Sequence, residues 1–404
     1  MINIGLLGLG TVGSGVVEII QHRSAAIMET TGTDIRVKKV LVKNIDKKRN
    51  IDLQDIILVS DFNDILDDNE INVIIEVTGD VESSYKYITE GLDAGKHIVT
   101  ANKAVVSKYF EEFSSLAQEK NLAFLYEASV GGGIPVLKPL REQIELNEIN
   151  EVQGILNGTC NYILTRMFNE DKDYKEVLKI AQDLGYAEAD PTADVEGHDT
   201  LRKLRILATL GLQGKVLEED IMLYGISSIA AIDIENIKKM DSTVKLIAEA
   251  KKQEDGYMAI VQPTIVRNNN YFANVNMAFN SVAFKGNNFG ELKFYGSGAG
   301  KLPTANAVLS DVLDIALNTY RKGNPLGQEH LKNLNSDIKG QYYLRVSESD
   351  EEIANKFKEI SKEVIQDNDD IAIITDEIKL SEVNDLLMKL GLGKDRYFLA
   401  KIMQ

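Results

Sequence analysis

Several residue types that mark particular protein classes are scarce in this sequence. It has a single cysteine, Cys160, so neither an intramolecular disulfide nor a Cys₄ zinc site can form, and a reducing cytoplasm is the expected location. The four histidines lack the spacing of metal ligands, and no run of about 18 apolar residues could span a membrane. A secreted, zinc-dependent or membrane-spanning protein is therefore not expected.

Basic residues are also in deficit, with 45 Lys and Arg against 62 Asp and Glu and a formal net charge of −17. Such a field repels phosphate backbones, and no local basic stripe offsets it, so we expect no nucleic-acid partner. At roughly 100–200 residues per domain, the 404 residues predict two or three globular domains.

The first third of the chain alternates short apolar runs with helix-like stretches. A strand-like run at 2–7 precedes a helical pattern over 12–21. Further strand-like runs follow at 37–42, 72–77, 97–100 and 122–126. This alternation predicts an α/β fold, a Rossmann-type doubly wound parallel sheet, which we assign to residues 1–133.

The pattern changes beyond the glycine-rich breaker at 131–133. Mixed strands and helices predict a second α+β domain over residues 134–321, whose last helix, about 305–320, returns to the first domain. Residues 322–337 are predicted to be a linker. Residues 338–404 are predicted to form a small α+β domain of the pattern β-α-β-α-β, with its first helix over 351–364.

The strongest local motif is a glycine turn, Gly8-Leu9-Gly10-Thr11-Val12-Gly13, between the first strand and the first helix. Gly8 permits a tight turn, Gly10 lets the backbone approach a pyrophosphate, and Gly13 allows close packing of helix and strand. The helix N-terminus then offers amide donors to the phosphates. The motif predicts dinucleotide binding.

The end of the second strand bears on the choice of cofactor. Lys43 follows that strand, Lys47-Lys48-Arg49 come next, and Asp46 is the one acid nearby. Basic residues there accommodate the 2′-phosphate of NADP, whereas an acid favours NAD. The sequence leans to NADP, with NAD as the alternative; a solvated basic turn is the non-functional interpretation.

An acidic loop precedes a helix in the second domain. Asp199 and Lys203 are four residues apart, so they share one face of this helix. One interpretation is an acid that complements the helix dipole together with an ordinary surface pair. The other is an acid-lined pocket for an amino group, with a lysine placed for proton transfer, whose pKa would have to fall from about 10.4. Elsewhere, Lys103 follows a predicted strand at the sheet edge where ligands bind.

Together these segments resemble homoserine dehydrogenases over about residues 1–321. The most specific blocks are 100–104, 127–135, 154–164, 185–199 and 296–304. The resemblance implies an NAD(P)-dependent oxidoreductase that interconverts L-aspartate 4-semialdehyde and L-homoserine, in the biosynthesis of threonine, methionine and isoleucine.

The resemblance also implies residue roles. Lys203 is similar to the family's general acid/base, with Asp199 and Lys103 as further catalytic residues. The residues implied to bind the substrate amino group are Glu188, Asp194 and Asp199. Those implied to bind the cofactor are Gly8, Gly10, Thr11, Val12, Gly13, Lys43, Thr78, Lys103 and Gly185. Those whose backbone carbonyls are implied to hold a monovalent cation, usually sodium in the family, are Glu127, Val130, Gly132 and Ile134.

Quaternary structure and regulation follow only by analogy. The resemblance implies that the second domain, residues 134–321, is the catalytic and oligomerisation domain, and the family favours a homodimer or homotetramer. Residues 338–404 are similar to an ACT domain. The family's Asp-Arg-Pro-Gly turn is replaced by residues 347–351, and the strand after the first helix is predicted to be shortened or lost, so threonine control stays open. Two other functions are also open: an acylating semialdehyde dehydrogenase using Cys160, and an amino-acid-sensing regulatory protein.

Overall fold

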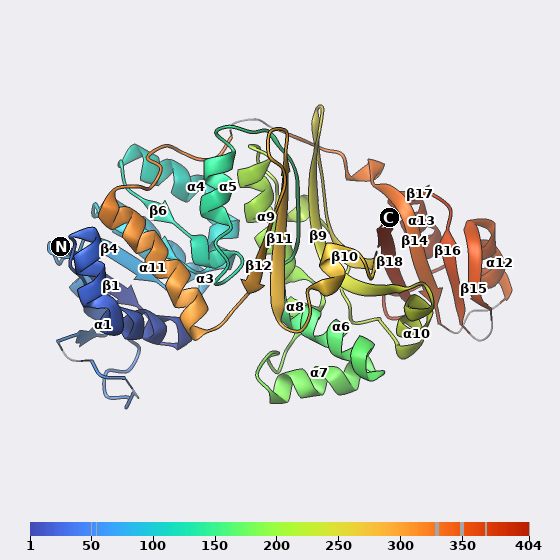
Figure 1. Cartoon of the computed structure of the whole chain (residues 1–404), viewed down its shortest axis with the longest axis horizontal. Coiled ribbons are helices and arrows are strands. Elements are labelled where there is room, and N and C mark those ends of the chain that lie inside the picture. The colour runs from blue at the N-terminus through green and yellow to red at the C-terminus, as the bar shows by residue number, and fades with distance from the viewer. Residues whose placement is uncertain (50, 54, 328–330, 348–350, 368–369, 404) are drawn as a thin grey trace. The chain divides into compact units, whose positions relative to one another are not determined.

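A computed structural model describes residues 1–403 except 50, 54, 328–330, 348–350 and 368–369, and the chain divides into two compact units (Figure 1). Unit 1 comprises residues 1–146, 209–215 and 296–329, and unit 2 comprises residues 147–208, 216–295 and 330–404. Among the described residues, no helix combines the length and apolar character that crossing a membrane requires.

Unit 1 contains a six-stranded, fully parallel sheet of order β3-β2-β1-β4-β5-β6. The strands are β1 Ile2–Leu7, β2 Ile35–Leu41, β3 Ile57–Val59, β4 Val73–Glu76, β5 His97–Thr100 and β6 Phe124–Leu125. The predicted doubly wound parallel sheet is confirmed. Strand order reverses between β1 and β4, which is where such sheets bind their ligands.

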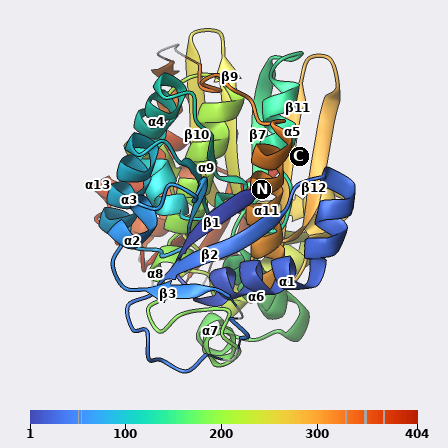
Figure 2. The same ribbon diagram turned by 90° about the vertical axis from the view of Figure 1, so that its left-hand side faces the viewer.

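Helices cover both faces of this sheet, as Figure 2 shows, with α1 and α11 on one side of β1 and α3 and α4 on the other. The helices are α1 Thr11–Thr31, α2 Asn63–Leu66, α3 Val81–Asp93, α4 Lys103–Glu119, α5 Leu137–Gln143 and α11 Lys301–Leu317. Helix α1 runs ten residues beyond the predicted end at 21, and Gly32 stops it in a left-handed conformation at φ 67°. A Cβ on Gly15 would lie 2.9 Å from the Cβ of Ala305, so a glycine is needed where α1 crosses α11.

Unit 2 is built on a mixed sheet of order β12-β11-β7-β9-β10-β18-β14-β16-β15. The strands are β7 Ile149–Ile155, β9 Ser242–Gln253, β10 Gly256–Arg267, β11 Phe279–Gly286, β12 Gly290–Ser297, β14 Lys339–Val346, β15 Ser361–Asp367, β16 Ile371–Thr375 and β18 Tyr397–Met403, with the short β8 Met222–Leu223, β13 Lys332–Asn333 and β17 Ile378–Lys379. The helices are α6 Gly158–Glu170, α7 Tyr174–Asp183, α8 Thr192–Val195, α9 His198–Gly211, α10 Ala231–Lys239, α12 Glu351–Glu359 and α13 Leu380–Lys389, and short 3₁₀ helices are η1 Glu127–Ser129 in unit 1 and η2 Glu218–Asp220, η3 Tyr271–Asn274 and η4 Asn335–Asp337.

Strand β9 is absent from the sequence prediction. Its residues Leu246 to Lys252 are typical of a helix, with alanine, glutamate and lysine prominent. The strand lies between β7 and β10, and residues 242–250 are all buried. Burial on both faces therefore outweighed local propensity here.

Apart from the two-residue strand β17, the C-terminal segment from residue 338 follows the chain order β14-α12-β15-β16-α13-β18, which is a β-α-β-β-α-β arrangement. The predicted helix over 351–364 is wrong at its end, because α12 stops at Glu359 and β15 begins at Ser361. The strand predicted to be shortened or lost is thus present over seven residues. Within the turn at 347–351, residues 348–350 lie outside the described residues.

This C-terminal segment is joined to the rest of unit 2 by the sheet and by a buried ion pair. Strand β18 pairs in parallel with β10. Arg345 of β14 donates to Asp233 of α10 at 2.8 Å, and the Tyr343 hydroxyl donates to the same carboxylate at 2.9 Å. Residues 332–333 of the predicted linker pair with β10 as well.

Candidate active site

The glycine turn joins β1 to α1 at the carboxyl edge of the parallel sheet. Gly8 has a φ of 103°, and its amide donates to the Leu41 carbonyl at 3.0 Å. A Cβ on Gly13 would lie 2.1 Å from the Gly8 carbonyl oxygen, whereas a Cβ on Gly10 would meet no atom within 4 Å. Gly13 therefore closes the turn, and the backbone at Gly10, beside Thr11 and Val12, is open to a ligand.

Thr78 lies just beyond β4, at the point where the strand order reverses. Its amide and hydroxyl donate to Oε1 of Glu76 at 2.7 and 2.6 Å, and the Thr100 hydroxyl donates to Oε2 at 2.8 Å. Glu76 is fully buried. The sequence analysis assigned no role to Glu76. The only local indication of a buried carboxylate is that this acid lies within the apolar run 73–77.

Lys43 is exposed, two residues beyond the end of β2. The hydrogen bonds from the Ser83 hydroxyl and amide lower the pKa of Asp80 below its usual value, and the positive charge of Lys43 lowers it further. Lys103 is the first residue of α4, and Asn102 caps that helix by accepting from the amides of Ala104 and Val105 at 3.1 and 3.3 Å. Both lysines thus lie at carboxyl ends of the parallel strands.

The four residues of the implied cation site lie on one loop after β6. The Glu127 carboxylate accepts from three consecutive amides, those of residues 136–138, at 2.6–2.8 Å, so it caps α5. Gly131 and Gly132 have φ of 76° and 58°, and a Cβ on Gly132 would lie 2.2 Å from the Gly298 carbonyl oxygen. Val130 and Ile134 are buried. Among the described residues, no group of three His, Cys, Asp or Glu side chains could hold a metal ion.

In unit 2, the lysine and acid of α9 belong to a buried hydrogen-bonded cluster. Lys203 Nζ donates to Asp199 Oδ2 at 2.7 Å and to the Leu156 carbonyl at 2.8 Å. Asn157 Nδ2 donates to Asp199 Oδ2 at 2.9 Å and to Asp194 Oδ1 at 2.7 Å. Lys203 is 8% exposed and Asp199 is 4% exposed, so theirs is not an ordinary surface pair.

Asn157, which joins the two acids, had no role in the sequence analysis. It caps α6, because its Oδ1 accepts from the Cys160 amide at 2.8 Å. An asparagine followed by glycine and threonine after a strand is a helix-start signal, and that signal was available. Its second role could not be read locally, since the two acids that it binds lie 37 and 42 residues away.

The remaining predicted residues of unit 2 lie on the loop between α7 and α8. Gly185 takes a left-handed φ of 78°. The Glu188 side chain is exposed, so the structure does not bring it into the buried cluster of Lys203 and Asp199. The Tyr186 carbonyl accepts from the Thr159 hydroxyl at 2.6 Å, which ties the loop to α6.

Cys160 is fully buried, and its thiol donates to the Asp194 carbonyl at 3.1 Å. Burial, and then the charge of Asp194, raises the pKa of this thiol well above its usual value. A nucleophile must be a thiolate, so this environment argues against thioester chemistry.

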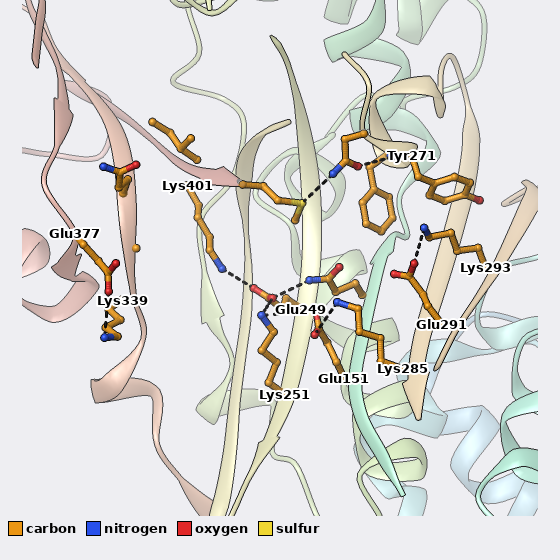
Figure 3. Close-up of a pocket in the computed structure, with 17 residues that line it drawn as sticks. Glu151, Glu249, Lys251, Tyr271, Lys285, Glu291, Lys293, Lys339, Glu377 and Lys401 are labelled. Atoms are coloured by element: carbon orange, nitrogen blue, oxygen red, sulfur yellow. Dashed lines mark hydrogen bonds and ion pairs between the residues drawn. The ribbon is translucent and has the colours of Figure 1, made fainter. Parts of the chain in front are cut away.

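A cavity of about 540 Å³ on the unit 2 sheet contains none of the predicted site residues. Its lysines are paired with glutamates, and Figure 3 shows Glu249 between Lys251 and Lys401. The Nζ atoms of Lys251 and Lys401 lie 2.5 and 2.8 Å from the carboxylate oxygens of Glu249. These cations hold the pKa of Glu249 at about 2, although burial opposes them. The lysines that line the cavity are therefore already paired with glutamates that line it.

Comparisons with known proteins agree with the fold. A family model described as homoserine dehydrogenase matches residues 135–313, and one described as the homoserine dehydrogenase NAD binding domain matches residues 8–127. A Bacillus subtilis homoserine dehydrogenase is 41% identical, over 96% of this chain and 95% of its own. A homoserine dehydrogenase from Synechocystis sp. is 44% identical, over 78% of this chain and 73% of its own. A crystal structure from Thiobacillus denitrificans superposes with a TM-score of 0.91 at 32% identity, covering 100% of this chain and 98% of that one.

The dinucleotide-binding fold and these matches define an NAD(P)-dependent oxidoreductase that acts on a CH–OH group. The chain belongs to the homoserine dehydrogenase family, and the family resemblance seen in the sequence is confirmed.

Proposed function

We propose that the protein interconverts L-homoserine and L-aspartate 4-semialdehyde, with Lys203 as the general acid/base. The observation that carries the mechanism is the buried cluster of Lys203, Asp199, Asn157 and Asp194. When bound, a nicotinamide cofactor supplies the hydride acceptor or donor for this reaction.

Lys203 has the geometry of a positioned proton carrier. An ammonium has three N–H donors, and two of them are directed at Asp199 and the Leu156 carbonyl. These two bonds fix the position of the amine, which we propose faces the substrate oxygen. In the reducing direction Lys203 gives this oxygen a proton as the alkoxide forms, and in the oxidising direction it takes the hydroxyl proton.

The substrate also carries an ammonium, which the acids of this loop can bind. Asp194 and Asp199 are oriented by the same asparagine, and Glu188 is exposed on the adjoining loop. Asp199 thus serves both the lysine and the substrate. This assignment explains why acids gather at a site whose cofactor is anionic.

For the cofactor we propose NADP over NAD, with Lys43 facing the 2′-phosphate. Residues proposed to bind it are Gly8, Gly10, Thr11, Val12, Gly13, Lys43, Thr78, Lys103 and Gly185. The backbone packs tightly against Gly13, and the backbone at Gly10 is open to a ligand, as the binding of a pyrophosphate requires. Lys103 is proposed to act at both the cofactor and the substrate.

Three further assignments rest on family analogy together with the fold. A monovalent cation is proposed at the carbonyls of Glu127, Val130, Gly132 and Ile134, on a loop whose left-handed glycines let it double back. The β-α-β-β-α-β segment at 338–404 is proposed as an ACT-like domain. A cytoplasmic homodimer or homotetramer is the proposed working form.

The test is a steady-state assay of purified protein with L-homoserine and either NADP or NAD. We expect homoserine-dependent formation of the reduced cofactor, with a higher kcat/KM for NADP. A protein that binds both cofactors but oxidises no homoserine would contradict the proposal. Equal rates in Cys160→Ser would separately eliminate the thioester route.

A further inference from the structure

Asn280 is a buried amide that the roles above do not use. It lies on β11 with no exposed surface, and both polar atoms of its side chain lack a hydrogen-bond partner among the described residues. Buried side-chain amides are nearly always hydrogen-bonded, because burial without a partner is costly. A residue that keeps both a donor and an acceptor unused is therefore suited to binding a ligand.

Its place in the sheet puts Asn280 beside the proposed site. Strand β11 pairs antiparallel with β7, and the last pair is Ser281 with Ile155. One residue further, Asn280 comes alongside Leu156, whose carbonyl accepts from Lys203 at 2.8 Å. A Cβ on Gly158 would lie 3.5 Å from Asn280 Oδ1, so the amide also lies against the first residue of α6.

The first turn of α6 favours a negative charge. Helix N-termini carry partial positive charge and unpaired amides, and α6 has 13 residues. Asn157 already uses its side-chain oxygen on the Cys160 amide, whereas Gly158 and Thr159 are partly exposed. Asp194 and Asp199, which accept from Asn157, carry the negative charge that suits the substrate ammonium. Of the charged groups on an amino-acid substrate, the α-carboxylate fits beside Asn280.

We propose that Asn280 is a substrate-binding residue whose side-chain amide donates to the α-carboxylate of the substrate at the N-terminus of α6. This inference rests on the proposed function and deepens it. Asn280 thereby makes the site prefer a hydroxylated α-amino acid, which has an α-carboxylate, over an amino alcohol, which has none.

The test compares Asn280→Leu with wild type on two ligands. One is L-homoserine, measured by KM, and the other is 3-amino-1-propanol, which lacks the carboxylate, measured by its inhibition constant Ki. We expect KM for homoserine to rise about 10- to 100-fold and Ki to stay within about twofold. Asn280→Asp should raise KM further and bind 3-amino-1-propanol more tightly, because its carboxylate repels one ligand and attracts the other.

Stability separates this role from a structural one. Leucine is close in size to asparagine and removes an unpaired buried amide, so the melting temperature should be unchanged or higher while KM rises. The control is Gln262→Leu, a buried amide on β10 whose register places it on the opposite face of the same sheet. This control should leave both KM and Ki unchanged.

Each other result overturns the assignment. An unchanged KM for homoserine in Asn280→Leu, or equal losses for both ligands, contradicts a carboxylate contact. If the wild-type protein oxidises homoserine and Asn280→Leu gives either of these results, only the role of Asn280 is refuted. Wild type that does not oxidise homoserine refutes the proposed function and this inference with it.

Discussion

The glycine turn of unit 1 and the lysine–acid cluster of unit 2 are built in opposite ways. The turn depends on side chains that are missing: Gly13 leaves no room for a methyl group, and Gly10 keeps the backbone accessible. The cluster depends on side chains that hold one another, with Asn157 donating to both Asp194 and Asp199. Adding one methyl group should break the first, and removing one functional group should break the second.

The largest expected effect is in the cluster. Lys203→Met should lower kcat by about 10²- to 10⁴-fold and leave the cofactor Kd unchanged, because the proton carrier is lost and the glycine turn is untouched. Steady-state kinetics and a cofactor titration measure both. The matched control is Lys179→Met, which removes the lysine of an exposed i,i+4 pair with Asp183, 68% and 60% exposed, and should have no effect. Near-normal turnover in Lys203→Met would refute the assigned role.

In the glycine turn, Gly13→Ala and Gly10→Ala should differ sharply. The new methyl group at position 13 meets the Gly8 carbonyl oxygen at 2.1 Å, so the loop must move, at a cost of about 3 kcal/mol of unfolding free energy. At position 10 the methyl group meets no protein atom, so stability should stay near wild type while the cofactor Kd rises about tenfold. Denaturant unfolding and cofactor titration test the pair, and equal stabilities would contradict the packing argument.

A third prediction concerns pH. Burial, and then the charge of Glu127, raises the pKa of Asp311 to about 8 from 3.8. The folded protein keeps this proton where the unfolded chain has lost it, so stability should fall as pH rises from about 4 to about 8. Asp311→Asn still accepts from the Glu127 amide, which lies at 2.9 Å, and does not ionise.

The melting temperature of Asp311→Asn should therefore depend less on pH than that of wild type. It should exceed wild type at pH 8 by the equivalent of about 2 kcal/mol. Parallel pH profiles of the two proteins would contradict the raised pKa. Asp311 thus lies in unit 1 outside the glycine turn, and its buried carboxyl stabilises this unit through its hydrogen bond with the Glu127 amide.

The smallest effect is expected at Lys43. Lys43→Ala should reduce the kcat/KM ratio of NADP to NAD by about tenfold, roughly 1.4 kcal/mol, because an exposed lysine pairs with a phosphate in a solvated setting. Kinetics with both cofactors measure the ratio, and Lys47→Ala serves as a control on the same turn. An unchanged ratio would mean that the basic turn is only solvated.

The same contrast explains what could be predicted from the sequence. The glycine spacing and the parallel sheet follow from local pattern, because each residue acts within its own turn or strand. Asn157 and Glu76 were missed because their partners come from other elements. Strand β9 was missed because its burial between β7 and β10 is a tertiary fact, and β15 because α12 ends without a glycine or proline. The family resemblance supplied roles that no local pattern carries, such as carbonyl ligands for a cation.

The most direct test of the account is deuterium transfer. L-Homoserine deuterated on the carbon that bears the hydroxyl should deliver one deuterium to the nicotinamide ring of NADP with the wild-type protein, and the transfer should be slowed by orders of magnitude in Lys203→Met. Label that appears in water, or reduced cofactor that carries none, would contradict hydride transfer from homoserine.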